Sequence, residues 1–323
     1  MNTPFVSVII PSYNSKDYIA QCLEKILDQS YPRDRYEVIV VDNGSTDNSP
    51  AIIQTYPVKF LTESRKGPSA ARNTGIRHAA GEYILFIDTD CMAGKDLIQR
   101  HMDAQAYYRK QDPAVRVVGG GIAGINRNFW ALCDNYCSWY MNHPKLKPRI
   151  EERQHLPTAN LSVERTVFET TGLFDENMRF GEDSMFCKMV KQKGYKLYFE
   201  PKAVAGHINR TSFQGLMRHA KEWAEIGKYT GPETPQSKTL NLKNPLVLAI
   251  YNLYYFGYRF GEIAWSWLSV GDLGFLVCFP VVFVNKLYFG FHMAKSRYAG
   301  KKSVKINVSQ GGTTAPTCGT MNR

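Results

Sequence analysis

The chain lacks both of the glycine-rich loops that bind phosphates in the commonest nucleotide-binding folds. Its first apolar run, Phe5–Ile10, leads into Pro11 rather than into a Gly-x-Gly-x-x-Gly turn, and no Gly-x-x-x-x-Gly-Lys-Ser/Thr segment occurs in the 323 residues. The first absence argues against a dinucleotide-binding Rossmann domain, and the second argues against a P-loop NTPase. A phosphate-bearing ligand would need another means of binding, and a metal ion is the obvious one.

The chain also lacks a disulfide framework and a zinc-site pattern. Its seven cysteines are scattered and odd in number, which fits a reducing cytosol. Cys133 and Cys137 are four residues apart, but no second Cys/His pair with suitable spacing follows, so we expect reduced thiols on a helix. No basic segment precedes the apolar run near the N-terminus, which indicates a strand rather than a signal peptide.

The first 200 residues have almost no net charge, and the positive charge of the chain is concentrated in the remainder. Residues 1–200 carry 25 Lys and Arg against 24 Asp and Glu, whereas residues 201–323 carry 15 against 5. Such asymmetry indicates an anionic partner surface. Because no zinc-finger or RNA-recognition signature accompanies it, the sequence favours a membrane surface and not nucleic acid.

Strand and helix patterns alternate over the first 90 residues. Because the expected strands are continuously apolar and short, they predict an α/β fold with a mostly parallel, Rossmann-like sheet covered by helices on both faces. The expected strands are Phe5–Ile10, Tyr36–Val41, Val58–Leu61 and Tyr83–Ile87, and the expected helices are Lys16–Gln29 and Gly67–Ala80.

Polar clusters follow three of these strands. They are Pro11–Asn14, Asp42 and Asp88–Asp90. In parallel sheets, ligands bind beyond the carboxyl ends of the strands. Asp-x-Asp is common, so Asp88-Thr89-Asp90 taken alone favours a strand end capped by solvated carboxylates. Three polar clusters at one sheet edge favour a site for a divalent cation and a phosphate-bearing ligand.

Eight segments in a fixed order resemble the family 2 glycosyltransferases of the GT-A fold, over about residues 5–210. These segments are Val6–Asn14, Val40–Asp47, Lys66–Gly75, Phe86–Asp90, Thr158–Ser162, Gly172–Glu176, Gly181–Ser184 and Pro201–His207. The resemblance implies an enzyme that transfers sugar from a nucleotide-diphosphate sugar. It also implies that the base and ribose of that donor contact Pro11, Tyr13, Asn14 and Asp42.

The resemblance assigns the donor's diphosphate to a metal. Asp90 would bind Mn²⁺ or Mg²⁺, Asp88 would contact the ribose and Arg72 would line the donor site. His207 would complete the metal shell or contact the diphosphate. Asn43 stands where relatives most often have a second Asp, which leaves uracil and thymine both open as the base. Taken singly, Asp42 fits a turn, Arg72 a surface helix charge and His207 a structural histidine.

Glu182 and Asp183 open an expected helix over Ser184–Lys193. Carboxylates are favoured in a first helical turn, so capping explains either one alone. An inverting transfer needs one carboxylate to take the acceptor hydroxyl proton, whereas a glycosidase needs two flanking the bond. The resemblance makes Asp183 that general base and places Glu182 and Asn160 in the acceptor site.

Two further segments leave alternatives open. Val115–Gly121 predicts a strand that runs into a glycine-rich turn. Phe129–Met141 is rich in Trp and Tyr and fits either an acceptor groove or the core.

The last third of the chain contains aromatic, uncharged runs after a linker at Gly231–Pro235. Each run is shorter than the roughly 20 residues of a membrane-spanning helix. Several aromatic residues suit a lipid headgroup region. We expect helices lying in the inner face of a membrane, or else a helical subdomain packed on the catalytic domain. The runs are Leu246–Tyr258, Leu273–Asn285 and Leu287–Ala294, and the aromatics include Tyr251, Tyr254, Tyr255, Trp265, Trp267 and Tyr288.

The predicted organisation is a catalytic domain at 1–230, a membrane-associated helical region at 231–298 and a disordered tail at 299–323. The predicted protein is an inverting glycosyltransferase at the cytoplasmic face of the cell membrane. Its donor is a UDP- or dTDP-type sugar, and its acceptor a lipid-linked or cell-envelope glycan. The alternatives are a non-catalytic sugar-nucleotide- or lipid-binding protein on the same fold, and a nucleotidyltransferase.

Overall fold

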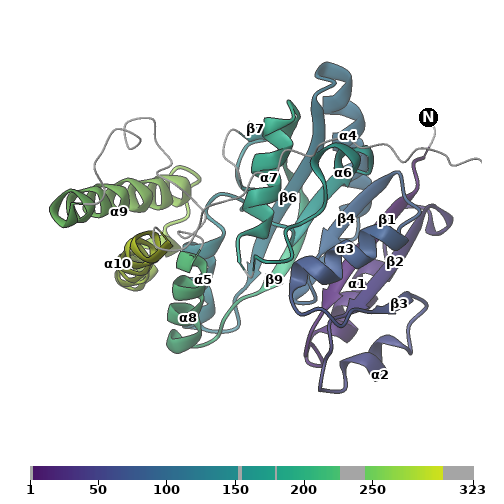
Figure 1. The fold of residues 1–323 in the computed structure, drawn as a ribbon, viewed down its shortest axis with the longest axis horizontal. Coiled ribbons are helices and arrows are strands. Elements are labelled where there is room, and N and C mark those ends of the chain that lie inside the picture. The colour runs from purple at the N-terminus through teal and green to yellow at the C-terminus, as the bar shows by residue number, and fades with distance from the viewer. Residues whose placement is uncertain (1–2, 152–154, 179, 226–243, 301–323) are drawn as a thin grey trace, which may run out of the picture.

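The computed structural model describes residues 3–151, 155–178, 180–225 and 244–300. It contains a nine-stranded mixed sheet with helices on both faces, followed by a group of helices at one end (Figure 1). The strands are β1 (Val6–Ser12), β2 (Tyr36–Asp42), β3 (Lys59–Thr62), β4 (Tyr83–Ile87), β5 (Cys91–Ala93), β6 (Val115–Ile125), β7 (Arg149–Glu151), β8 (Asn160–Glu164) and β9 (Lys196–Ile208).

Helices alternate with these strands in the order that the sequence predicts. The described helices are α1 (Ile19–Leu27), α2 (Ser49–Ile53), α3 (Pro68–His78), α4 (Leu97–Gln111), α5 (Phe129–Ser138), α6 (Thr166–Thr171), α7 (Glu182–Gln192), α8 (Phe213–Ala224), α9 (Pro245–Leu268) and α10 (Gly274–Gly300), with a 3₁₀ turn, η1, at Arg33–Arg35. The predicted α/β architecture is confirmed.

The sheet is parallel over β3-β2-β1-β4. In that part Ser12 pairs with Asp42, and Ile9 pairs with Phe86. The loops after β1, β2 and β4 therefore lie at one edge, as the strand order predicts. The later strands add antiparallel pairs: β8 lies against β4 and β6, and β5 lies against β9 with Cys91 opposite His207. This last pairing carries His207 to the same edge as Asp88–Asp90.

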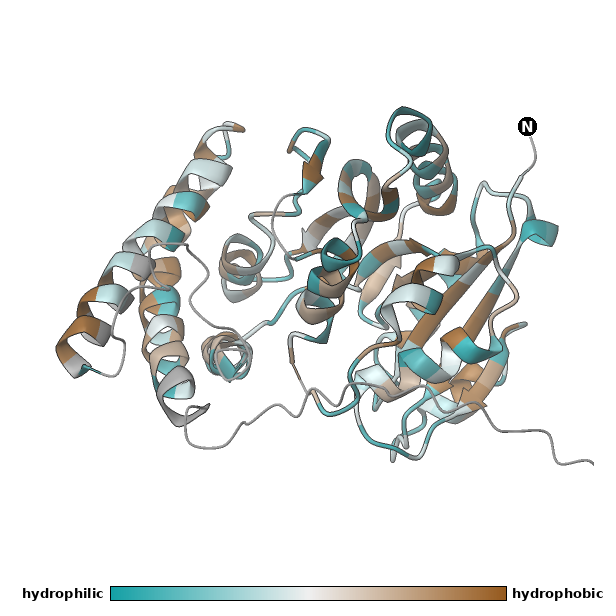
Figure 2. Cartoon of the chain, turned by 45° about the horizontal axis from the view of Figure 1, so that its top comes forward, coloured by the Kyte–Doolittle hydropathy of each residue, from teal (hydrophilic) through white to brown (hydrophobic). Residues whose placement is uncertain are grey.

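Side chains that alternate along the strands supply two cores, one on each face of the sheet. Val8 on β1 packs with α1, α2 and α4, whereas the adjacent Ile9 packs with α3, α6 and α7. Burying each such side chain contributes about 1.5–3 kcal/mol relative to leaving it in water. Figure 2 shows these strands as continuously hydrophobic ribbon, the pattern expected for a sheet covered on both sides.

The expected glycine-rich turn after Val118 is not a turn. Strand β6 continues through the glycines to Ile125. A Cβ at Gly120 would lie 2.3 Å from both the Asn160 Nδ2 and the Ala203 carbonyl oxygen. The glycines are therefore explained by the close approach of β8 and β9, which the sequence pattern alone could not distinguish from a loop.

The C-terminal helices pack against α5 and α8, beside the sheet. Helix α10 contacts α5, α8 and α9, and a shared apolar cluster includes Tyr136 of α5 and Phe275 of α10 (Figure 1). The expected runs Leu273–Asn285 and Leu287–Ala294 are joined in this one helix. Its segment Gly274–Ser296 is long and apolar enough to cross a membrane by length and composition. Each run considered alone had been too short for that.

The predicted headgroup aromatics divide into two groups. Trp267 and Tyr251 are buried, so for them the headgroup prediction is wrong, because they pack inside the helical group. Trp265 is 75% exposed and Tyr254 is 61% exposed. The predicted linker at 231–235 and nearly all of the predicted tail, from 301 onward, lie outside the described residues.

Candidate active site

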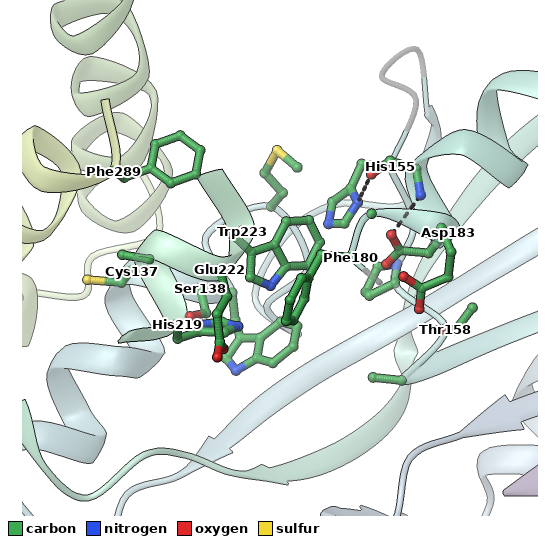
Figure 3. A pocket seen from close by; sticks show the side chains of 18 of the residues that line it. Cys137, Ser138, His155, Thr158, Phe180, Asp183, His219, Glu222, Trp223 and Phe289 are labelled. Atoms are coloured by element: carbon green, nitrogen blue, oxygen red, sulfur yellow. Dashed lines mark hydrogen bonds between the residues drawn. The ribbon is translucent and has the colours of Figure 1, made fainter. Parts of the chain in front are cut away.

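A cavity of about 1810 Å³ opens at the carboxyl edge of the sheet and extends to the C-terminal helices. Figure 3 shows part of its wall, with Asp183 at one end, Phe289 of α10 at the other and Trp223 of α8 between them. The structure brings eight of the predicted site residues into this one wall. They are Pro11, Tyr13, Arg72, Asp88, Asp90, Glu182, Asp183 and His207.

Asn14 and Asp42 lie beside the cavity rather than in its lining. Asn14 adopts a left-handed backbone with φ of 47°, and its Oδ1 accepts the Thr46 N–H at 2.8 Å, which joins the loops after β1 and β2. Asp42 is buried, and its Oδ2 accepts the N–H groups of Gly44 and Ser45 at 3.2 Å each. Asp42 Oδ1 is buried and has no hydrogen-bond partner among the described residues. The turn therefore uses one carboxylate oxygen of Asp42 and leaves the other, Oδ1, without a hydrogen bond.

Asn43, which stands where relatives most often have a second Asp, makes three hydrogen bonds within the protein through its side chain. Its Nδ2 donates to the carbonyls of Glu63 and Arg65 at 3.1 and 2.7 Å, and its Oδ1 accepts the Gly67 N–H at 2.7 Å. These bonds need both a donor and an acceptor, which an amide has and an ionised carboxylate lacks. Asn43 therefore fixes the loop that leads into α3.

Arg72, on α3, joins two carboxylates of the cavity lining that come from separate parts of the chain. It is 4% exposed, and its guanidinium donates to Asp88 Oδ1 at 2.8 Å and to Glu182 Oε1 at 2.7 Å. Burial alone would lower the pKa of Arg72, but these carboxylates raise it above its usual value. Buried charges of this kind are tolerated only when they are paired, so Arg72 fixes Asp88 and Glu182 relative to each other.

Asp90 and His207 form the candidate metal centre. Asp90 Oδ2 lies 3.4 Å from His207 Nε2, and these atoms form a group with Cys91 Sγ in which all lie within 4.8 Å of one another. Burial raises the pKa of the Cys91 thiol, with Asp90 adding to the effect, so that sulfur stays protonated. Asp90 and His207 are thus the ligands that fit a hard divalent cation.

The His207 ring is oriented by its neighbour Asn209. Asn209 Nδ2 donates to the Ala131 carbonyl at 3.1 Å, which turns its Oδ1 toward His207 Nδ1 at 3.0 Å. The same Oδ1 accepts Trp139 Nε1–H at 3.0 Å. Because an amide oxygen only accepts, Asn209 favours the ring orientation in which Nδ1–H donates to it, and Nε2 then lies on the side of Asp90 as the atom that could bind a metal. Metal-binding histidines are commonly oriented in this way.

Asp183 is the second residue of α7, which begins at Glu182 directly after Gly181, a glycine with a backbone φ of 77°. The carboxylate is 5% exposed and accepts the Ser184 N–H at 2.7 Å. Burial raises the pKa of Asp183 to about 6, with the Ser184 N–H and Arg72 acting against the rise. A carboxylate with a pKa near working pH, in a cavity, suits a general base.

Glu182 has a different environment from its neighbour. Burial raises the pKa of Glu182, and the charge of Arg72 opposes that rise. Because one oxygen of Glu182 is engaged by Arg72 at 2.7 Å, Glu182 is held as part of the wall.

Asn160 is a sequence prediction that the structure contradicts. It is fully buried and does not line the cavity. Its Oδ1 lies 2.8 Å from His101 Nε2, and its Nδ2 donates to the carbonyls of Gly121 and Ala203 at 3.0 and 2.8 Å. With these bonds made inside the sheet, Asn160 joins β6, β8 and β9 and has no access to an acceptor.

The sequence reasoning missed Asn209 and much of the aromatic wall. Trp139 lines the cavity and lies 4.7 Å from the His207 ring, centroid to centroid. Trp223 and Phe180 extend into the cavity in Figure 3. Within the Phe129–Met141 segment, Trp139 lines the cavity, whereas Tyr136 belongs to the apolar cluster. The polar residues that follow His207 were the available signal for Asn209.

Residues 7–164 match the family model described as glycosyl transferase family 2. The chain is also 32% identical, over 213 residues, to the glycosyltransferase AglE of Haloferax volcanii; the match covers 64% of this chain and 68% of that protein. The chain belongs to glycosyl transferase family 2. As a family 2 glycosyltransferase, it carries its candidate site residues both inside the matched segment and beyond it, on α7 and β9.

A second relative and a solved structure extend the comparison. A Methanococcus voltae enzyme named dolichyl N-acetyl-alpha-D-glucosaminyl phosphate 3-beta-D-2,3-diacetamido-2,3-dideoxy-beta-D-glucuronosyltransferase is 25% identical over 231 residues, which is 66% of this chain and 70% of that one. The mannosyltransferase PcManGT from Pyrobaculum calidifontis, solved with GDP-Man and Mn²⁺, superposes with a TM-score of 0.58. At 22% identity over 94% of this chain and 87% of the other, it shows the shared GT-A fold.

Proposed function

We propose that this protein is an inverting, metal-dependent glycosyltransferase that transfers sugar from a UDP- or dTDP-type donor to a lipid-linked or cell-envelope glycan. The observation that carries the proposal is the placement of Asp183, buried with a raised pKa, in the same cavity wall as Asp88, Asp90 and His207. One wall thus holds a candidate base and a candidate metal centre.

The carboxylate oxygen of Asp42 that has no hydrogen bond, Oδ1, supports uracil or thymine as the donor base. Uracil and thymine each present a single imide N–H between two carbonyls. Asp42 offers a single acceptor, Oδ1, because its Oδ2 already takes two backbone N–H groups. Guanine presents two adjacent donors and would match a carboxylate with both oxygens free. Pro11, Tyr13 and Asn14 complete this end of the donor site, and the 53% exposed Tyr13 ring offers a face on which a base can stack.

The metal centre is assigned from Asp90 and His207, whose facing atoms are already oriented. A bound Mn²⁺ or Mg²⁺ supplies neutralisation of the charge that develops on the leaving diphosphate. Arg72 holds Asp88 at the same edge, where Asp88 contacts the donor ribose.

Asp183 takes the proton from the acceptor hydroxyl as that oxygen attacks the anomeric carbon. The attack inverts the configuration there in a single displacement, and the nucleoside diphosphate leaves. Glu182, fixed by Arg72, borders the position of the acceptor.

The acceptor is assigned from the position of the C-terminal helices. Residues 1–230 are the proposed catalytic domain, and the region 231–298 the proposed membrane-associated part, at the cytoplasmic face. Helices α9 and α10 line the far end of the cavity and present exposed apolar side chains outward. A lipid-linked acceptor would reach the site from that side, and the Methanococcus voltae relative has such an acceptor in its name.

The test is a nucleotide-sugar panel assayed for nucleoside diphosphate release, with and without Mn²⁺, in membranes that contain the endogenous acceptors. Wild type is expected to use UDP- or dTDP-sugars only when metal is present. Asp183→Asn should still bind the nucleotide but lose transfer by about 100-fold or more, the usual contribution of a general base.

The matched control is Asp175→Asn, which makes the same chemical change at an exposed residue. Full transfer by Asp183→Asn would exclude Asp183 as the base. Binding of no sugar nucleotide by wild type would refute the proposed function, and release without added metal would refute only the metal centre. Preference for a GDP-sugar would refute the assignment made from Asp42.

A further inference from the structure

The far end of the cavity contains a lysine whose charge no described side chain balances. Lys286 lies in the middle of α10, between Asn285 and Leu287, and lines the cavity. Its Nζ donates to the Cys137 carbonyl at 2.8 Å. Within the described ranges, no carboxylate lies within ion-pair distance of Nζ, and the Cys137 carbonyl accepts only one of its three N–H donors. An ammonium group in an apolar wall is costly unless an anion accompanies it.

The surroundings of Lys286 increase the need for an anion. Arg259 on α9 approaches the Tyr140 ring at 5.9 Å from its centroid, and Lys286 approaches the same ring at 6.0 Å. Arg259 is paired with Glu262 at 3.1 Å. Asp134, the acidic group on the neighbouring helix α5, is already engaged by Arg210 at 3.1 Å. Lys286 thus differs from Arg210 and Arg259 in having no paired carboxylate among the described residues.

The same helix indicates what carries the anion. Its outward face is a stripe of exposed apolar side chains at helical spacing, whereas its inward face packs on α5, α8 and α9. A helix that is apolar on both faces is buried on both, and here the outer face would be buried in the hydrocarbon of a membrane. Lys286 lies between the two faces. The outward residues are Leu276, Val277, Phe283, Val284, Leu287 and Phe291.

We propose that Lys286 binds the phosphate of a membrane lipid to which the acceptor sugar is attached. The lipid chain lies along the outward face of α10, and the sugar lies in the cavity toward Asp183. Figure 3 places Cys137 and Phe289, two of the residues that Lys286 contacts, at the end of the cavity away from Asp183. Trp223 lies between that end of the cavity and Asp183, and the sugar residues attached to the phosphate would occupy this stretch. This inference rests on the proposed function and specifies its acceptor as a lipid phosphate or diphosphate.

Lys286 also has a structural role, which the experiment must distinguish from phosphate binding. The Cys137 carbonyl is at the C-terminal end of α5, where a cation is stabilising in its own right. Lys286→Met removes the charge and keeps most of the stem, and Lys286→Arg keeps the charge and a donor for the carbonyl. Lys295→Met is the matched control, because Lys295 is exposed on the same helix and does not line the cavity.

The experiment measures binding of three probes to the full chain in detergent micelles: geranylgeranyl phosphate, geranylgeraniol and inorganic phosphate. Wild type is expected to bind the lipid phosphate at least tenfold more tightly than either other probe. Lys286→Met should lose about tenfold of that affinity, as expected for one charge-assisted hydrogen bond, and leave geranylgeraniol binding unchanged. Lys286→Arg and Lys295→Met should remain within about threefold of wild type.

Equal binding of the lipid phosphate and the alcohol by wild type would overturn the proposal, and so would unchanged affinity in Lys286→Met. Inorganic phosphate that binds as tightly as the lipid phosphate would show an anion site without a lipid, which also overturns it. UDP binding with Mn²⁺ is measured on the same samples. If UDP binds but the lipid phosphate does not, this inference alone fails, whereas loss of both means that the proposed function fails. If Lys286→Met does not fold, the wild-type comparison of phosphate with alcohol and the Lys286→Arg result still decide.

Discussion

Arg72 and Glu182, which are 110 residues apart in the chain, meet inside the cavity wall with Nη1 donating to Oε1 at 2.7 Å. The same guanidinium holds Asp88 through its other terminal nitrogen at 2.8 Å. One buried cation therefore joins the proposed donor side of the cavity, at the end of β4, to the proposed acceptor side, on α7. Planar, two-pronged pairing of this kind requires arginine, since a lysine ammonium cannot present two parallel donors.

Arg72→Met is predicted to lower the free energy of unfolding by about 3 kcal/mol, because it leaves Asp88 and Glu182 without their buried counter-charge. Arg77→Met is the control: Arg77 lies on the same helix, is 47% exposed, and is 3.6 Å from Glu176. That variant should change stability by less than about 0.5 kcal/mol. Urea unfolding measures both. A coupling energy near zero in the cycle of Arg72→Met with Glu182→Gln would show that the two residues do not stabilise each other.

Asp183→Asn is predicted to be more stable than wild type at neutral pH while losing transfer. Because burial raises the pKa of Asp183 to about 6 from its usual 3.8, ionisation of the carboxyl group opposes folding above that pH. The neutral amide still accepts the Ser184 N–H and avoids this cost, which gives a gain of about 2 kcal/mol. The gain should shrink as the pH falls below 6, where wild-type Asp183 is protonated. Thermal unfolding at pH 7.5 and pH 5 checks this, and Asp175→Asn should show no such pH dependence.

The pH dependence of transfer follows from the same carboxyl group. A general base must be ionised, so kcat/KM should rise as the pH passes through about 6 and then level off. UDP binding measured over the same range separates this effect from pH-dependent donor affinity. A rate that is flat between pH 5 and pH 7.5, with constant UDP binding, would be inconsistent with Asp183 as the base.

The sequence predicted the parallel strands and the sheet edge well, because these depend on local patterns. Continuous β-branched runs followed by polar turns placed Asp42 and Asp88–Asp90 correctly. The sequence could not show that Asn160 points into the sheet, since its three partners come from α4, β6 and β9, all distant in the chain. Nor could it show that Arg72 is buried, because the carboxylates that make burial tolerable lie 16 and 110 residues away.

The C-terminal region shows a second limit. Lys286 divides the apolar sequence into two short runs, and length alone then argued against a spanning helix. In the fold the lysine faces a cavity rather than the outward apolar surface, so it does not interrupt helix α10. Whether a charge breaks an apolar stretch depends on the direction of its side chain, which is a property of tertiary packing.

Asn209 is predicted to control metal affinity without binding the metal. Asn209→Leu removes the acceptor that fixes the proton on His207 Nδ1, so the ring loses its orientation toward Asp90. Losing such a partner typically costs 10- to 100-fold in metal affinity. Electron paramagnetic resonance of free Mn²⁺ during titration measures the change. Asn126→Leu, which alters only the exposed partner of Asn209 Nδ2, should bind Mn²⁺ as wild type does.

Charge placed on the outward face of α10 is predicted to reduce membrane binding without unfolding the protein. Val277 and Leu287 are 66% and 50% exposed, so Val277→Glu and Leu287→Glu disturb no core. Each glutamate opposes burial in lipid and repels anionic headgroups, so binding to vesicles of phosphatidylglycerol and phosphatidylcholine should fall at least tenfold. Tyr107→Glu on α4, where the side chain is 61% exposed, is the control and should leave binding nearly unchanged. Equal vesicle binding by all three variants would mean that α10 does not face the membrane.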